Sequence, residues 1–86
     1  MYKREDITEH IQRSMQNYRL KHSLMQEYMA EMLGMSTRAY WNHEHGKHGV
    51  SVPCTVSFLL LLSEEELMEF LEGLRGLKGG QLHERG

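Results

Sequence analysis

The chain has 86 residues, which suffice for one small domain but not for a second hydrophobic core. Its hydrophobic fraction of 40% suits a globular protein, and its longest apolar run, residues 58–62, is far shorter than the roughly 20 residues that cross a bilayer. The first ten residues also lack the apolar stretch of a signal peptide. We therefore expect a cytoplasmic protein with no membrane contact.

The net charge of −2 does not favour nucleic-acid binding, because contacts to phosphates supply much of that affinity. The distribution along the chain is less adverse. Residues 1–50 hold seven basic and six acidic side chains, whereas residues 51–86 hold three basic and six acidic ones. Any surface that binds an anionic partner is therefore expected in the first half.

Cys54 is the only cysteine, so the chain can form neither an internal disulfide nor a cysteine-based zinc site. We expect a small buried apolar group at the start of a helix. A reactive, redox-sensing thiol is the alternative.

Residues 6–21 are expected to form the first helix. The apolar side chains Ile7, Ile11, Met15 and Tyr18 recur at i, i+4, i+8 and i+11, which places them on one face of an amphipathic helix. This helix should pack behind the segment that follows it.

Residues 26–46 are expected to form a short helix from Gln26, a tight turn at residues 33–35 and a second helix that opens at Ser36. Two helices that cross steeply through so short a turn need a residue free to adopt a positive φ, which Gly34 supplies. The Ser36 hydroxyl can cap the second helix.

Helical spacing divides the second of these helices into two rows. The inward row is Tyr40, His43 and Glu44. The outward row holds side chains that suit the edges of bases in a DNA groove better than a protein core. Its members are Thr37, Arg38, Trp41, Asn42 and His45.

This segment resembles the helix-turn-helix of the phage repressor and Cro (Xre-like) family, and the flanking residues 11–62 also fit that family. The matching positions are Gln26, Ala30, Gly34, Ser36, Glu44 and Gly46. The resemblance implies an all-α, compact five-helix lambda-repressor-like DNA-binding domain over residues 1–75.

The resemblance also implies a DNA interface in which the helix from Ser36 enters the major groove. Thr37, Arg38 and Asn42 match base-reading positions, and Gln26, Ser36 and His45 match phosphate-contacting ones. Trp41 either packs against a sugar or thymine methyl, or folds back onto the edge of the domain. The complete expected DNA-binding set is Gln26, Ser36, Thr37, Arg38, Trp41, Asn42, His45 and Lys47.

In this family an arginine at the position of Arg19 pairs with the glutamate that matches Glu44, so we expect an ion pair here; two independent surface charges are the alternative. His43 departs from the family, which usually has an aliphatic residue there. Either the imidazole is buried, neutral and hydrogen-bonded, or the helix is tilted or loosely held.

The histidines of residues 43–48 allow a metal site, but the position four after His43 is Lys47 rather than the histidine of the H-E-x-x-H pattern. We instead expect a solvated cluster near DNA. It would become positive below about pH 6.5 and tighten the contact with phosphates.

Pro53 suits the first position of a fourth helix. Residues 56–62 are almost all apolar, so this helix should be buried on most of its sides, inside the domain or against a second subunit.

Ser63 and Glu66 form the pattern of a capping box and should open a fifth helix, which we expect Gly73 and Gly76 to end. Its apolar face should close the core or also form a dimer seam. Residues 76–86 are expected to form a flexible tail.

The sequence thus predicts a sequence-specific DNA-binding transcriptional regulator of bacterial or phage type that acts on double-stranded DNA as a homodimer. It shows no catalytic constellation, and we expect no enzyme activity and no cofactor. The alternative is a protein-interaction module, or an antitoxin-like protein with a protein partner, on the same fold.

Overall fold

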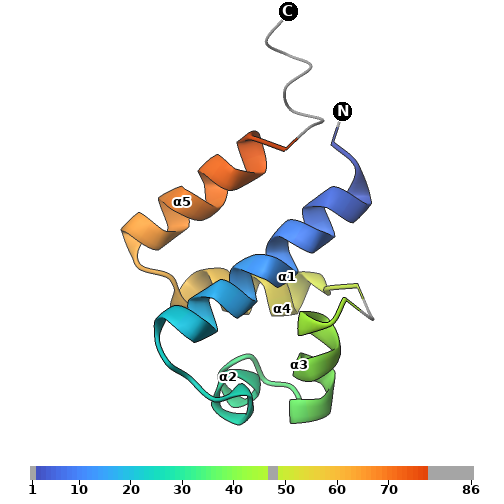
Figure 1. Ribbon diagram of the computed structural model, residues 1–86, viewed down its shortest axis with the longest axis vertical. Helices are drawn as coiled ribbons and strands as arrows, with labels where there is room; N and C mark the ends of the chain where they lie inside the picture. The colour runs from blue at the N-terminus through green and yellow to red at the C-terminus, as the bar shows by residue number, and fades with distance from the viewer. Residues whose placement is uncertain (1, 47–48, 78–86) are drawn as a thin grey trace, which may run out of the picture.

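The computed structural model describes residues 2–46 and 49–77 (Figure 1). Over these residues the chain is all-helical and compact. Its five helices are α1 (Arg4–Lys21), α2 (Gln26–Met32), α3 (Thr37–Glu44), α4 (Val52–Leu61) and α5 (Glu64–Arg75).

The helices α1 and α5 lie in contact and run in opposite directions, and α4 passes behind α1 in the view of Figure 1. The pair α2 and α3 lies at the far end, where α3 also contacts α1. The long first helix therefore packs directly against α3, which in turn contacts α2.

Serine side chains begin three of the helices. The hydroxyls of Ser36, Ser51 and Ser63 accept hydrogen bonds from the backbone N–H three residues later, over 3.1, 3.2 and 3.1 Å. Glu66 completes the predicted capping box by accepting from the Ser63 N–H over 2.9 Å. Each cap satisfies a backbone donor that the helix itself leaves unpaired.

Three predicted boundaries were wrong. The first helix begins at Arg4 rather than at residue 6, and Pro53 is the second residue of α4 rather than the first. Gly73 does not end α5, which continues to Arg75. A Cβ at Gly73 would collide with the ring of His10 on α1, so this glycine lets the two helices approach closely.

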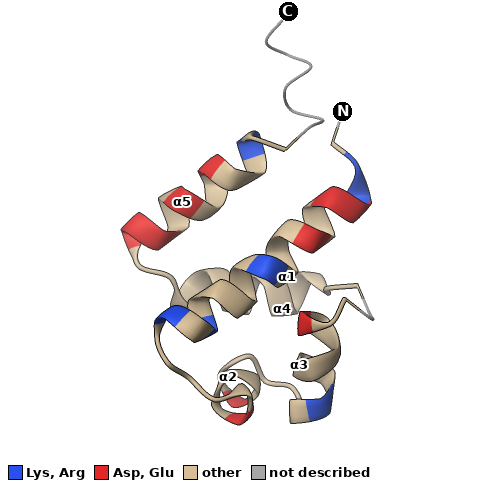
Figure 2. Cartoon of the chain, in the orientation of Figure 1, with Lys and Arg blue, Asp and Glu red and all other residues tan. Residues whose placement is uncertain are grey.

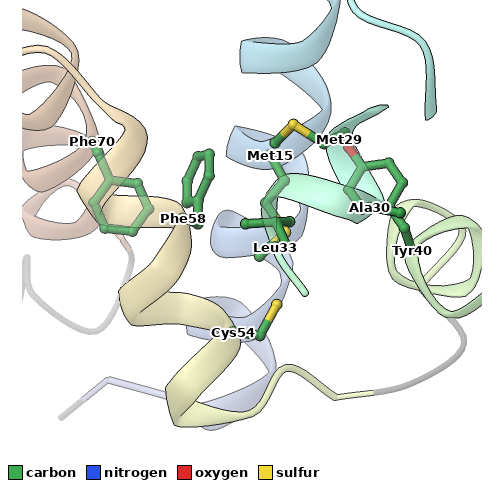
Figure 3. Packing of buried hydrophobic residues seen from close by; sticks show 8 residues of the cluster. All are labelled: Met15, Met29, Ala30, Leu33, Tyr40, Cys54, Phe58 and Phe70. Atoms are coloured by element: carbon green, nitrogen blue, oxygen red, sulfur yellow. The ribbon is translucent and has the colours of Figure 1, made fainter. Parts of the chain in front are cut away.

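The core lies between all five helices (Figure 3). Tyr40 and Phe58 are its largest fully buried side chains. Cys54 is buried as predicted, and burial raises the pKa of its thiol, which favours the inert structural role over the redox one. The whole buried cluster is Met15, Met29, Ala30, Leu33, Tyr40, Cys54, Phe58 and Phe70.

The fourth helix is only partly buried within this chain, so burial inside the domain alone, one of the two predicted alternatives, was wrong. Cys54 and Phe58 are buried, but Val52, Val56 and Leu60 are 74%, 47% and 79% exposed. A domain this small has too few elements to cover a helix on every side.

Phe70 of α5 is buried in the core, so the apolar face of this helix does cover the core as predicted. Met68 on the same helix remains exposed. No described helix is long and apolar enough to cross a membrane. The expectations for Lys47, His48 and residues 78–86 fall outside the described residues.

Candidate nucleic-acid interface

A three-residue turn holds α3 across the end of α2. Gly34 has φ +73°, the left-handed conformation expected of it, and Met35 N–H donates to the Ala30 carbonyl over 3.0 Å. Ser36 then adopts an extended conformation and caps α3. The turn therefore satisfies its own backbone groups and fixes the start of α3.

The inward row of α3 is buried as predicted. Tyr40 is completely inaccessible, His43 is buried, and the Glu44 side chain is 2% exposed. Burial at three successive inward positions shows that α3 packs into the domain along this row, as the buried alternative for His43 predicted.

Glu44 is the centre of a network that joins α1, α2 and α3. Arg19 donates from Nε to Oε2 over 2.6 Å and from Nη2 to Oε1 over 3.1 Å, which confirms the predicted ion pair. Gln26 donates its amide to the same Oε1 over 3.0 Å, and Arg19 Nη1 donates to the Leu24 carbonyl over 3.0 Å. The C-terminal end of α3 is thus tied to the first residue of α2 and to the last turn of α1.

The network also sets the ionisation of its members. Burial alone would raise the pKa of Glu44, but the hydrogen bonds from Arg19 and Gln26 and the charge of the guanidinium help to leave that pKa lowered. Burial, and after it the Glu44 carboxylate, raises the pKa of the Tyr40 hydroxyl. Glu44 is therefore ionised at neutral pH, and Tyr40 is neutral.

The outward row faces solvent. Thr37, Arg38, Trp41 and His45 are exposed, and Asn42 is partly exposed. Helical spacing thus predicted correctly which side chains of this helix are free to meet a partner.

Two other residues of the predicted set have local roles in the structure. Ser36 is exposed, although its hydroxyl is engaged as the helix cap. Gln26 is partly buried, and its amide is committed to Glu44 rather than presented to solvent. Lys47 lies outside the described residues.

Trp41 and His45 form a stacked pair along α3, with ring centroids 3.7 Å apart and planes inclined by 21°. The His45 Nδ1–H donates to the Trp41 carbonyl over 2.8 Å, which leaves Nε2 as the other polar atom of the ring. The indole therefore neither folds into the domain nor stands alone, and remains 39% exposed. The i, i+4 spacing of two aromatic rings is the signal in the sequence that could have predicted this stack.

Charge near this face is mixed. Arg38 is the only lysine or arginine of α3, and Figure 2 shows acidic segments on the adjacent α2. The neighbouring α2 carries exposed Glu27 and Glu31. An anionic partner would therefore meet an attractive guanidinium on α3 and acidic side chains beside it.

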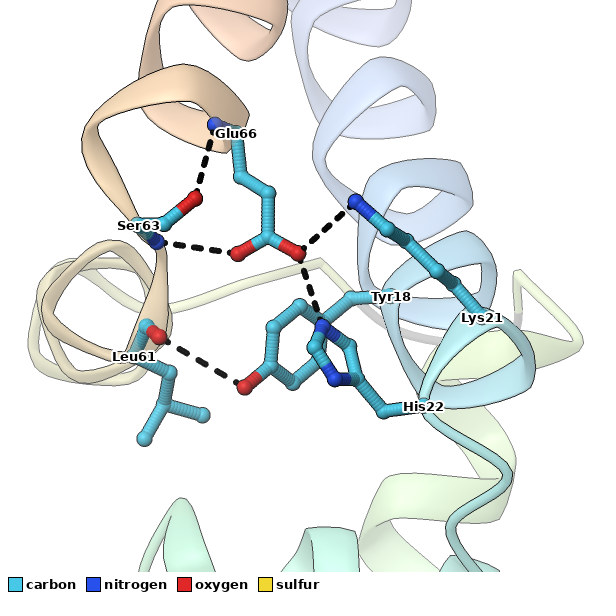
Figure 4. Close-up of polar contacts among 6 residues, drawn as sticks. All are labelled: Tyr18, Lys21, His22, Leu61, Ser63 and Glu66. Atoms are coloured by element: carbon cyan, nitrogen blue, oxygen red, sulfur yellow. Dashed lines mark hydrogen bonds and ion pairs between the residues drawn. The ribbon is translucent and has the colours of Figure 1, made fainter.

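A second polar cluster lies between the end of α1 and the start of α5 (Figure 4). Glu66 Oε2 accepts from Lys21 Nζ over 3.1 Å and from His22 Nε2 over 2.7 Å. The ring of His22 packs against Tyr18, with centroids 4.2 Å apart. The predicted cap of α5 is thus also a link to α1, a role that local sequence could not reveal.

Among the described residues, no group of three or more histidine, cysteine or acidic side chains is arranged to hold a metal ion. Comparisons of the chain with protein-family models, with curated proteins and with solved structures found no match.

Proposed function

We propose that this chain is a sequence-specific DNA-binding regulator of bacterial or phage type, built on a lambda-repressor-like fold, with α3 in the major groove. The observation that carries the proposal is the division of α3 into two rows. Tyr40, His43 and Glu44 anchor the helix inward, while an uninterrupted polar and aromatic row faces solvent. A rigidly held helix with hydrogen-bonding groups along its free face has the form that major-groove recognition requires.

The residue types of the outward row supply both direct readout and discrimination. A guanidinium such as that of Arg38 binds guanine O6 and N7 together, and a carboxamide such as that of Asn42 does the same with adenine N6 and N7. Each such pair is worth about 1–3 kcal/mol of preference over a wrong base. Thr37 adds a hydroxyl and a methyl group at the start of the same row.

The Trp41–His45 stack gives this row a preformed apolar wall. The indole is held by the imidazole over one face, so it needs little reordering to pack against a sugar or a thymine methyl. Nδ1 of His45 is already engaged with the Trp41 carbonyl, so Nε2 is the ring atom that can face a phosphate.

Gln26 acts mainly as a support in this proposal, because its amide holds Glu44 in place. A direct phosphate contact would require that amide to leave the carboxylate. Gln26→Ala is accordingly expected to weaken binding to all sequences alike.

A single α3 offers too little surface for high affinity, so we propose that two copies bind half-sites about 34 Å apart. The protein would then recognise a two-fold symmetric sequence in double-stranded DNA.

The test is fluorescence anisotropy with labelled random-sequence duplexes at low and moderate salt, followed by selection of bound duplexes from a random pool. We expect affinity that falls steeply with salt, and one enriched sequence. Arg38→Ala should abolish the preference at one base pair, whereas Arg75→Ala, which removes the same charge from the end of α5, should not. Absence of binding at low salt, or identical pools for wild type and Arg38→Ala, would overturn the proposal.

A protein-interaction module, including an antitoxin-like one, is the second candidate. The net charge of −2 and the exposed Glu27 and Glu31 beside α3 favour it. It predicts no duplex binding at any salt concentration, so the same experiment separates the two functions.

A further inference from the structure

We infer that the exposed face of α4 is a two-fold interface on which a second copy of this chain packs its own α4 in the antiparallel direction. Val52, Val56 and Leu60 define this face, which we call the α4 stripe. Their spacing of i, i+4, i+8 forms one ridge along the helix, and such ridges are the surfaces that interlock when two helices pack.

The exposure of the α4 stripe is large for aliphatic side chains. The three residues are 74%, 47% and 79% accessible, on a helix whose opposite side is buried through Cys54 and Phe58. Apolar side chains gathered in this way mark a surface that another molecule covers. Val52 and Val56 also line a groove whose other wall is Ile7 and Ile11 of α1, so the apolar surface continues beyond the helix itself.

Charge identifies the occupant as a second copy. No charged residue occurs in α4 from Val52 to Leu61, although 26% of the chain is charged. A nucleic acid, a charged peptide or a lipid headgroup would find no counter-charge along this ridge. In a two-fold interface each residue meets its own counterpart or a neighbour of it, and a neutral ridge meets that condition without repulsion.

The two ends of the α4 stripe make the antiparallel arrangement favourable. Arg4 lines the same groove as Val52, at the first turn of α4, and Glu64 and Glu65 follow the last turn, all three exposed. When two α4 helices pack in opposite directions, the arginine end of one lies beside the glutamate end of the other. Both ends of the seam then carry opposite charges, whereas parallel packing would bring like charges together.

The exposed apolar residue of α5 does not suit a second copy as well. Met68 on α5 is 54% exposed, but Glu64, Glu65, Glu69 and Glu72 are exposed on the same helix. A two-fold axis through that face would place carboxylates against carboxylates. Of the two helices that the sequence offered as a dimer seam, α4 is therefore the one selected here.

The α4 stripe is small beside the roughly 800 Å² per partner of a standard stable interface, so the dimer should dissociate on dilution. The inference does not depend on DNA binding. A chain that dimerises through α4 but binds no duplex overturns only the proposed function. A chain that binds duplex but stays monomeric without DNA overturns only this inference.

The test is sedimentation velocity of the full chain without DNA over a wide range of concentrations, compared among wild type, Leu60→Glu and Met68→Glu. Both substitutions introduce the same charge at an exposed position, and circular dichroism should show both variants folded. We expect a dissociation constant at least tenfold higher for Leu60→Glu and unchanged for Met68→Glu. A wild type that remains monomeric throughout, or a dimer that only Met68→Glu weakens, would overturn the inference.

Charge reversal tests the direction of packing. Arg4→Glu should raise the dissociation constant of the dimer, and adding Glu64→Lys and Glu65→Lys to that variant should restore it. If the triple variant dimerises no better than Arg4→Glu, the antiparallel arrangement is wrong.

Discussion

Arg19 donates hydrogen bonds to both carboxylate oxygens of Glu44, with N···O distances of 2.6 and 3.1 Å. This contact joins the last turn of α1 to the last residue of α3. The pair is nearly buried, with side chains 14% and 2% exposed. A pair in this position holds α3 at the end farthest from its Ser36 cap. Its removal should therefore affect both the stability of the domain and the orientation of the outward row.

Replacing only one member of this pair should lower the free energy of unfolding more than replacing both members. Glu44→Gln or Arg19→Met leaves one charge buried without its partner, which costs roughly 3 kcal/mol. The double variant should lose clearly less than the sum, with a coupling above about 1 kcal/mol in urea unfolding.

The exposed Arg13–Glu9 pair is the matched control for that cycle. Its charged atoms also lie 2.6 Å apart, but both side chains are about two-thirds exposed. Its coupling should stay near 0.3–0.5 kcal/mol. Equal coupling for the two pairs would contradict the structural role of the Arg19–Glu44 contact.

Glu66 should make the domain sensitive to acid. Hydrogen bonds from the Ser63 backbone and the His22 ring, assisted by Lys21, lower the pKa of Glu66 from 4.5 to about 2. A carboxyl whose pKa is lowered by folding stabilises the native state above its unfolded pKa. That stabilisation should disappear as the pH falls from about 4.5 to about 2.

The check is the free energy of unfolding, measured with urea at a series of acidic pH values. Glu66→Gln should flatten the dependence in this interval, while Glu65→Gln, an exposed neighbour with the same charge change, should leave it as in wild type. An unchanged profile for Glu66→Gln would show that the contacts in Figure 4 do not stabilise the folded state.

Gly73→Ala should destabilise the domain although alanine favours helix formation by about 1 kcal/mol. The new methyl group would push the His10 ring away from its hydrogen bond to the Phe70 carbonyl, which is 3.0 Å long. Overpacking of this kind typically costs about 1–3 kcal/mol.

The effect of Gly73→Ala on the free energy of unfolding should change sign when the His10 ring is absent. In a His10→Ala background the space beside Gly73 is free, so Gly73→Ala should raise the free energy of unfolding by about 1 kcal/mol. Thermal and urea denaturation of the four variants measure both effects. The close packing of α1 on α5 would be refuted if the substitution had the same sign in both backgrounds.

Trp41 is the only tryptophan, so its fluorescence reports directly on the proposed interface. Duplex DNA should change its emission, and Arg38→Ala should shift that change to higher DNA concentrations. His45→Ala should alter the emission even without DNA, because the stacked imidazole is lost. Emission that stays constant while anisotropy reports binding would place the contact surface elsewhere.

The elements that rest on local spacing could be predicted from the sequence. The two rows of α3, the glycine of the turn and the capping box of α5 each depend on residues within one or two helical turns. The Arg19–Glu44 pair could be predicted only through the resemblance, because 25 residues separate its members and spacing alone leaves them as two surface charges.

What could not be predicted depends on how distant helices meet. Glycine disfavours helix formation, so the sequence predicted that the helix ends at Gly73. The reason for a glycine inside α5 is the ring of His10 on α1, which occupies the space that a Cβ would need. The exposure of Val56 and Leu60 likewise depends on which helices pack against α4, and the apolar sequence of α4 does not reveal this. The phosphate role that the resemblance implies for Gln26 leaves out its hydrogen bond to Glu44, because 18 residues separate the two and local spacing does not bring them together.

The separation of α3 into two rows has a practical consequence for engineering. The hydrogen bonds at the Glu44 carboxylate come from Arg19 and Gln26, so exchange of Thr37, Arg38 and Asn42 should leave them in place. A library randomised at these three positions should remain folded in nearly all members. On the proposed function, such exchanges should change which DNA sequence the protein prefers.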